Sequence, residues 1–401
     1  MDPRLNSPSR LARLRRDLFG TPLDGAITIA LLAALGAGAQ ALLNWALSRA
    51  DWAVIQANST LLAVGRYPMA QQWRLWLLTG LLCGATGASW GLLRHRSWPR
   101  NDRIAAGLLL AMALLVPAAL ELGLDVQARW WAIAGLLLLA RWAAGRWSHR
   151  LPLICQKLWP LAWPGLYVLG LGLIGGGLGL QPVRTSQWGG LLLTLIEASF
   201  AIVLCFPLGI ALALGRRSEL PLLRWGSTIY IEFIRGAPLI TLLFLGQNIL
   251  GFLLPGGLAP ERVWRAAWVL TFFAAAYVAE AVRAGLTALP RGQIEAARSL
   301  GLNSLQTVVH VVLPQALRVA LPATVGQFIT LLQDTTLLSL IGLLDLLGTA
   351  RAIMANPDFL GRNAEVYLVL AVLFWCCCAA LGLGCRALEH RLNRHSSTAS
   401  R

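Results

Sequence analysis

Few side chains in this sequence have a type and a position that would allow chemistry, and the clearest of them lie inside apolar stretches. Asp334 lies within the apolar stretch 321–347, where Thr335 and Thr336 follow it and Gln327 precedes it by two helical turns. A charged side chain at bilayer depth is costly, so it indicates a functional site by default. We expect these four residues to line a polar path or to bind an ammonium group. The open alternative is a helix-packing contact in which Asp334 pairs with an arginine of a partner subunit.

The sequence contains no set of residues that is typical of catalysis or of metal binding. Its five histidines lie in connectors or tails, and its seven cysteines include no C-x-x-C pair. An ATP-binding loop of the Walker A type ends in lysine followed by serine or threonine, but the only lysine, Lys157, is followed by leucine. We predict that the chain is not an enzyme, that it holds no cofactor of its own, and that a partner binds and hydrolyses any ATP.

The composition of the chain is that of a membrane protein. Hydrophobic residues make up 57% of the sequence and charged residues only 13%, whereas soluble domains carry about a quarter charged residues. A helix needs about 20 apolar residues to cross a bilayer. We predict an all-α, polytopic membrane protein with about ten transmembrane helices, or eight if two early segments lie at the interface. The expected spans are 25–48, 73–93, 104–122, 129–147, 160–180, 188–214, 237–254, 264–285, 321–347 and 366–388.

Basic residues recur in short clusters between these apolar stretches. The net charge is +16, but no single face or tail concentrates it, which argues against nucleic-acid binding. With ten spans, all the clusters fall on one side of the membrane, and the positive-inside rule assigns that side to the cytoplasm. Both termini are then cytoplasmic. The clusters lie near Arg10, Arg94, Arg146, Arg216, Arg291 and Arg386.

The connector between the stretches that end near Gly285 and begin near Leu321 lies on the same basic side and carries helix signals. Proline breaks a helix, glycine at a helix end adopts a left-handed backbone easily, and asparagine or serine can cap a new helix. The sequence therefore predicts a helix–turn–helix that lies across the membrane surface. Its expected landmarks are Pro290 as a break, a helix over 292–300 with Glu295 in its first turn, Gly301 as the stop, Asn303 or Ser304 as the next cap, and Pro314 as the end.

The same connector resembles the EAA loop of ABC-importer permeases, whose pattern is E-A-A, three residues, G, nine residues and I-x-L-P. Glu295-Ala296-Ala297 is followed by three residues and Gly301, and nine more residues lead to Val311. Valine in place of isoleucine at 311 is the only departure from the pattern. In that family the loop is a coupling helix that docks into a cleft of the ATPase subunit. The resemblance therefore implies ATPase coupling by Glu295, Ala296, Ala297, Gly301, Leu302, Leu313 and Pro314.

Residues 188–392 also resemble the polar amino-acid branch of this permease family, which carries an E-x-x-R-G-x-P-L segment. The N-terminal part, with its GRYPMAQQWR segment, is similar to the longer general L-amino-acid permease subunit. Two Glu-x-x-Arg pairs place both members on one helix face, where they could form ion pairs. We interpret the following residues as structural or interfacial: Glu232, Arg235, Gly236, Pro238, Glu280 and Arg283.

The resemblance implies accessory transmembrane helices over 1–187, a five-helix permease core over 188–392 that contains the coupling loop 290–314, and a cytoplasmic tail over 393–401. The implied function is that of a permease subunit in the bacterial inner membrane, which forms half of the path of an ATP-driven importer for polar L-amino acids. The implied partners are a cytoplasmic ABC ATPase dimer, a second related permease, a periplasmic amino-acid-binding protein and membrane lipid. The alternative is a secondary transporter or membrane enzyme without an ATPase partner, although we find no clear inverted repeats.

Overall fold

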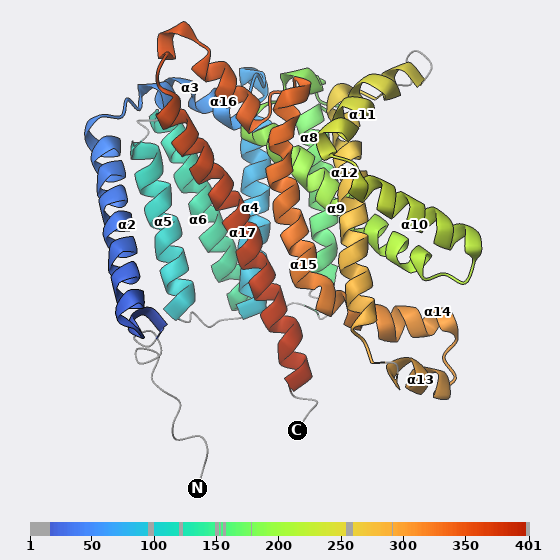
Figure 1. Ribbon diagram of the computed structural model, residues 1–401. Helices are drawn as coiled ribbons and strands as arrows, with labels where there is room; N and C mark the ends of the chain where they lie inside the picture. The colour runs from blue at the N-terminus through green and yellow to red at the C-terminus, as the bar shows by residue number, and fades with distance from the viewer. Residues whose placement is uncertain are drawn as a thin grey trace. The chain divides into compact units, whose positions relative to one another are not determined.

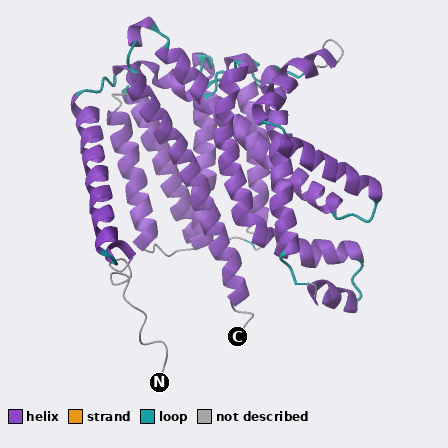
Figure 2. Ribbon diagram, in the orientation of Figure 1, coloured by secondary structure: helices purple, strands orange, loops and turns teal. Residues whose placement is uncertain are grey.

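The computed structural model describes residues 17–94, 100–119, 123–148, 152, 154, 158–177, 179–253, 260–290 and 292–397. These residues form helices and loops and no strand, although Gly190 and Asp345 make an isolated bridge (Figure 2). The predicted all-α class is therefore confirmed. The predicted basic tail around Arg10 lies outside the described residues, and so do Lys157 and Arg291. The chain divides into two compact units, Met1–Ala53 (unit 1) and Val54–Arg401 (unit 2).

Unit 1 contains helix α2 (Pro22–Ser48), which begins with a complete capping box. The Thr21 hydroxyl accepts the Asp24 N–H, and the Asp24 carboxylate accepts the Thr21 N–H, each at 3.1 Å. Two donors that the helix start leaves unpaired are thereby satisfied. The helix is about 40 Å long, which exceeds the roughly 30 Å of the apolar core of a bilayer. None of its residues is buried, as expected of a helix whose side chains face lipid.

In its described residues, the first half of unit 2 consists of five α-helices, two of which, α4 and α6, are in backbone contact. These helices are α3 (Ala53–Val64), α4 (Trp73–Arg94), α5 (Arg100–Ala119), α6 (Leu124–Trp147) and α8 (Ala162–Gly175). A Cβ at Gly87 would lie 2.1 Å from the Leu137 carbonyl oxygen, so glycine is needed where α4 meets α6. Between α5 and α6, Asp102 and Arg141 form a buried ion pair at 3.3 Å.

The second half of unit 2 is built around two long helices, α9 and α12, which lie side by side with α15 (Figure 1). Its helices are α9 (Gly190–Arg216), α10 (Pro221–Gly236), α11 (Leu239–Leu253), α12 (Arg262–Thr287), α13 (Gly292–Ser299), α14 (Ser304–Gln306), α15 (Leu313–Asp334), α16 (Leu346–Met354) and α17 (Asn363–Ser397). Buried alanines line α12, and a Cβ at Gly209 would lie 2.6 Å from the Val278 side chain. Small residues thus let the helices approach where lipid provides no hydrophobic drive for association.

The two ends of unit 2 carry different helices, and the basic clusters gather at one of them. One end carries α13, α14 and the C-terminal end of α17, and the opposite end carries α3 and α16 (Figure 1). The C-terminal end of α9 belongs to the first end, because Arg217 donates a hydrogen bond to the Leu286 carbonyl oxygen at 3.3 Å. The basic clusters around Arg216, Arg298 and Arg386 therefore share one end of the unit, as the charge pattern predicts.

The structure does not confirm the predicted number of membrane spans. Six described helices are long and apolar enough to cross a bilayer, or seven if the bent pair α10–α11 is one span. The expected span 160–180 contains α8, whose 14 residues extend only about 21 Å. The expected span 129–147 is α6, where Arg141 and Arg146 interrupt the apolar sequence. The multi-pass membrane fold is supported, and the count of ten stays a prediction.

The apolar stretch 321–347 is not one continuous α-helical span. The α-helix α15 ends at Asp334, the 3-10 helix η5 (Thr335–Ile341) follows, and Gly342 ends that helix with φ +78°. Asp334 therefore lies at a change of helix type, towards the C-terminal end of the candidate span Ser304–Ile341. The prediction that Pro314 ends a helix is also wrong. The π-helix η4 (Thr307–Val312) continues into α15, whose first turn contains Pro314.

Candidate functional site

The segment 290–314, called the EAA hairpin below, begins with α13 and turns at Gly301. Gly301 has φ +81°, and its N–H donates to the Arg298 carbonyl oxygen at 2.9 Å. The Leu302 N–H donates to the Ala297 carbonyl oxygen at 3.2 Å. These two bonds form a Schellman motif, which satisfies carbonyl groups that the end of a helix leaves unpaired. The glycine stop expected from the sequence is present.

The second arm of the hairpin begins at Asn303 and continues into a core helix. The Asn303 side chain accepts the Gln306 N–H at 2.8 Å, and the Gln306 side chain accepts the Asn303 N–H at 3.0 Å. This capping box starts α14, which leads through η4 into α15 without a break. A Cβ at Gly285 would lie 2.4 Å from the Ala316 carbonyl oxygen. The hairpin is therefore joined to α12 and α15 at the point where these helices touch.

The outer surface of the hairpin exposes large apolar side chains. Leu300 is 82% exposed and Leu305 is 73% exposed, whereas Ala297 is only 3% exposed. Glu295 and Ala296 are also exposed. Of the remaining residues of the pattern, Leu302 and Leu313 are partly buried, and Gly301 and Pro314 are exposed. Exposed leucines at a polar end of a bundle are typical of a surface that a partner covers.

Five charged side chains from α9, α10 and α12 form an ion cluster near this end of unit 2. The Glu280 carboxylate lies at its centre, 2.6 Å from Arg216, 3.0 Å from Arg283 and 3.6 Å from Arg235. Glu232 pairs with Arg216 at 2.8 Å. The pair of Glu280 and Arg283 expected from the sequence is present, but the expected pair of Glu232 and Arg235 is not. Each of these two residues instead bonds a neighbouring helix, so the cluster ties α10 to α9 and α12.

Gly236 and Pro238 lie where α10 gives way to α11. The axes of the two helices differ by 106° across this break, and the Pro238 carbonyl oxygen accepts the first N–H bonds of α11, from Thr241 at 3.1 Å. Arg235 lies just before the break, with its guanidinium 5.7 Å from the centre of the Tyr277 ring of α12. The ion cluster thus holds the α10 side of the bend, and the structural role of Gly236 and Pro238 stays a prediction.

The four residues expected to line a polar path are not all on one surface. Gln327 and Asp334 are seven residues apart, share a face of α15, and are both partly buried. The Thr335 hydroxyl is buried and donates to the Leu332 carbonyl oxygen at 2.6 Å. The Thr336 hydroxyl donates to the Gln333 carbonyl oxygen. The threonine hydroxyls therefore donate to their own helix, and a role of the four residues in a path stays a prediction.

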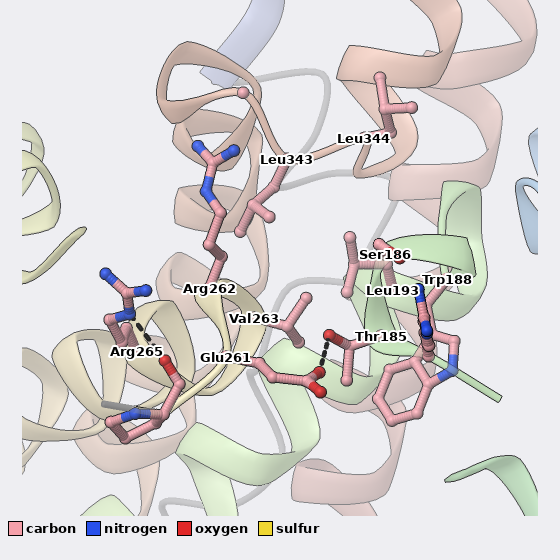
Figure 3. Close-up of a pocket in the computed structure, with 13 residues that line it drawn as sticks. Thr185, Ser186, Trp188, Leu193, Glu261, Arg262, Val263, Arg265, Leu343 and Leu344 are labelled. Atoms are coloured by element: carbon pink, nitrogen blue, oxygen red, sulfur yellow. Dashed lines mark hydrogen bonds between the residues drawn. The ribbon is translucent and has the colours of Figure 1, made fainter. Parts of the chain in front are cut away.

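A pocket of about 400 Å³ opens at the end of unit 2 opposite the EAA hairpin, because the N-terminal ends of α9 and α12 line it (Figure 3). Its polar wall contains Glu261, which accepts a hydrogen bond from Thr185. Arg262 donates to the Ile341 carbonyl oxygen at 2.6 Å, and Arg265 donates to that of Gln247 at 2.6 Å. The arginines therefore connect the last residue of η5 and the second half of α11 to the start of α12.

The sequence prediction missed functional candidates at this opposite end. Glu261 and Arg262 belong to no motif that would single them out in the sequence. Glu197 was not singled out, although it is an ionisable residue inside the expected span 188–214, and the criterion that identified Asp334 also applies to it. Asp345 belongs to the expected span 321–347, and the structure shows it as the fully buried N-cap of α16.

Comparison with known proteins identifies relatives over nearly the whole chain. Residues 205–394 match the family described as binding-protein-dependent transport system inner membrane component. The inner membrane amino-acid ABC transporter permease protein YhdY of Escherichia coli is 35% identical over 97% of this chain and 94% of its own. The glutamate/glutamine/aspartate/asparagine transport system permease protein BztC of Rhodobacter capsulatus is 33% identical over 95% and 93%. A crystal structure of an amino acid ABC transporter is 28% identical, covers 58% of this chain and 97% of its own, and gives a TM-score of 0.45.

Proposed function

Because this chain belongs to the family of binding-protein-dependent transport system inner membrane components, we propose that it is a permease subunit of an ATP-driven amino-acid importer. It forms half of the translocation path and performs no catalysis itself. The observation that carries this proposal is the EAA hairpin, in which the Schellman turn at Gly301 presents Glu295 and Leu300 on an exposed surface. Relatives named as amino-acid permeases support the substrate class, here polar L-amino acids.

The proposed partners follow from the two ends of unit 2. A cytoplasmic ABC ATPase dimer covers the exposed leucines of the EAA hairpin, and a periplasmic amino-acid-binding protein delivers substrate at the opposite end. A second, related permease completes the path as a heterodimer. The proposed orientation puts the hairpin and both termini in the cytoplasm, and the positive-inside rule, applied to the basic clusters near the hairpin, supports it. ATP is bound by the ATPase, so this chain supplies no nucleotide site.

The hairpin converts movement of the ATPase into movement of the core helices. Its Schellman turn and capping box make both arms rigid, so a displacement of α13 reaches α15 through η4. The close contact of Gly285 with Ala316 carries the displacement to α12, and the ion cluster carries it from α12 to the bend between α10 and α11. Residues Gln327 and Asp334 of α15 then move relative to the facing permease, and they supply polar groups along the path.

The proposal is tested with Leu300→Arg, which places a charge on the surface proposed to bind the ATPase. Leu360→Arg is the matched control, since Leu360 is 70% exposed and lies between α16 and α17 at the opposite end. We expect Leu300→Arg to weaken co-purification of the ATPase at least roughly tenfold, equivalent to about 1.4 kcal/mol, while the control binds normally. Amino-acid uptake that persists in membranes without any ATPase would establish a secondary transporter and overturn the proposal.

A further inference from the structure

Two carboxyl groups meet in the interior of unit 2, at the end opposite the EAA hairpin. Asp345 precedes α16, and the next residue, Leu346, donates its N–H to the Thr194 hydroxyl of α9 at 3.0 Å. Glu197 follows Thr194 by three residues and so lies on the same face of α9. The Gly190 N–H donates to the Leu344 carbonyl oxygen at 2.9 Å, which fixes the two segments side by side. The carboxyl groups lie close enough for Asp345 to act electrostatically on Glu197.

The two carboxyl groups differ in their hydrogen bonds. Both residues are 0% exposed. Asp345 accepts the N–H groups of Leu347 at 3.1 Å and of Gly348 at 2.9 Å, so backbone donors stabilise its negative charge. Neither carboxyl oxygen of Glu197 has a hydrogen-bond partner among the described residues. An ionised carboxylate without donors is strongly disfavoured in an apolar interior.

The surrounding elements supply little charge to compensate the pair. From α16, Arg351 acts on Asp345, but its side chain is exposed. From α8, the Tyr167 hydroxyl lies near Glu197. In α12, which packs most closely on α9, no ionisable residue lies between Arg265 and Tyr277, and η5 contains none. The other elements packed on α16 and α9 add further carboxyls, the buried Glu365 of α17 and the partly buried Asp334 of α15. Among the described residues, two negative charges in this junction would therefore face each other without an adjacent buried cation.

We propose that Glu197 and Asp345 form a binding site for one proton, which Glu197 holds as a carboxylic acid beside the Asp345 carboxylate. Neither residue lines the pocket described above, and their full burial leaves access only to a species as small as a proton unless the helices separate. With the proton bound, α16 stays packed on α9. When it is lost, two like charges repel each other across the junction and loosen α16.

The electrostatics of Asp345 agree with this site. Burial raises the pKa of the Asp345 carboxyl to about 7, although the Leu347 and Gly348 N–H groups and Arg351 favour its charged form. The junction therefore disfavours charge even on a carboxyl that accepts two hydrogen bonds. A carboxyl whose neutral form the fold favours contributes stability that is complete below the pKa it has in the unfolded chain. This stability is lost as the pH rises to the pKa it has in the fold, which for Asp345 is a window from about pH 4 to about pH 7.

The test uses the purified full-length chain in lipid nanodiscs and needs no transport activity, so its failure is distinguishable from failure of the proposed function. Thermal unfolding is measured from about pH 4, near the ordinary pKa of a carboxyl, to about pH 9, on the wild type, Glu197→Gln and Glu219→Gln. Glu219 is an exposed glutamate between α9 and α10 and serves as the control. We expect the melting temperature of the wild type and the control to fall as pH rises, and Glu197→Gln to reduce this fall by at least half. An unchanged fall in Glu197→Gln overturns the proposal.

Two further measurements distinguish a bound proton from a bound metal cation. Infrared difference spectra at neutral pH, wild type minus variant, should show a carboxylic-acid carbonyl band for Glu197→Gln and for Glu197→Met, the second variant in case the first does not fold. Difference spectra without that band in both variants contradict protonation of Glu197, whereas bands that other carboxyls share between wild type and variant cancel. At high pH, sodium chloride is compared with choline chloride. Recovery of the wild-type melting temperature by sodium alone would show that the site takes a metal cation instead, and would also overturn the proposal.

Discussion

The Arg216 guanidinium lies 2.6 Å from the Glu280 carboxylate and thereby joins the C-terminal end of α9 to α12. The same arginine reaches Glu232 of α10 at 2.8 Å, so one side chain connects three helices. Glu280 in turn forms ion pairs with three arginines, and its side chain is only 17% exposed. The cluster carries three positive and two negative charges, so each glutamate is needed to keep the arginines together.

Replacement of Glu280 by Gln should destabilise the core more than replacement of Glu232 by Gln. Glu280→Gln removes the central charge and should cost about 1.5–3 kcal/mol, as expected for hydrogen bonds to charged groups. Glu232 has a side chain that is 56% exposed, so Glu232→Gln should cost at most about 1 kcal/mol. Chemical or thermal unfolding of both purified variants provides the measurement. Equal losses would show that burial does not set the strength of the cluster.

Replacement of Gly301 by Ala should loosen the turn of the EAA hairpin. An L-residue at φ +81° costs about 1–2 kcal/mol, although a Cβ would meet no atom within 4 Å. Gly292→Ala is the matched control, because Gly292 also has open space around it and lies in α13, where alanine is favourable. Hydrogen exchange at the Leu302 amide should accelerate in Gly301→Ala alone. Identical exchange in both variants would refute the importance of the left-handed turn.

Replacement of Gly285 by Ala should separate α12 from α15 where the two helices touch next to the EAA hairpin. The new methyl group would lie 2.4 Å from the Ala316 carbonyl oxygen, and such overpacking costs about 1–3 kcal/mol. Gly326→Ala in α15 meets nothing within 4 Å and should be neutral or stabilising by up to about 1 kcal/mol. ATPase activity and amino-acid uptake are measured in the same membranes. Loss of uptake with retained ATP hydrolysis would show that this contact carries the coupling; normal uptake would exclude that role.

Replacement of Asp334 by Ala should reduce amino-acid-stimulated ATPase activity and uptake together, because it removes the only charge on the Gln327 face of α15. A tenfold loss corresponds to about 1.4 kcal/mol. Thr330→Ala is the control, since the Thr330 hydroxyl is exposed and bonds the Gly326 carbonyl oxygen of its own helix. Normal stimulation and normal uptake in Asp334→Ala would remove this residue from the translocation path and favour the packing interpretation.

Local features could be predicted from the sequence because they depend on residues close together in the chain. The stop at Gly301, the cap at Asn303 and the pair of Glu280 with Arg283 each involve partners within a few residues. Pro314 misled the prediction, since a π-helix that brings a proline into the first turn of α15 has no simple sequence signal. The EAA pattern was still recognisable, because the spacing of its glutamate, glycine and proline depends only on the lengths of the two arms of the hairpin.

The sequence by itself determined the membrane fold, the family and the position of the EAA hairpin, because hydropathy, helix ends and motif spacing are local properties. Only the tertiary structure decided that Glu232 bonds Arg216 instead of Arg235, and that Asp334 lies where α15 changes to a 3-10 helix. It also decided that Glu197 lies beside Asp345, a residue almost 150 positions away. Such pairs depend on which helix faces meet and at what height, and α9, α12 and α16 fix these relations through the packing of small side chains over long sequence distances.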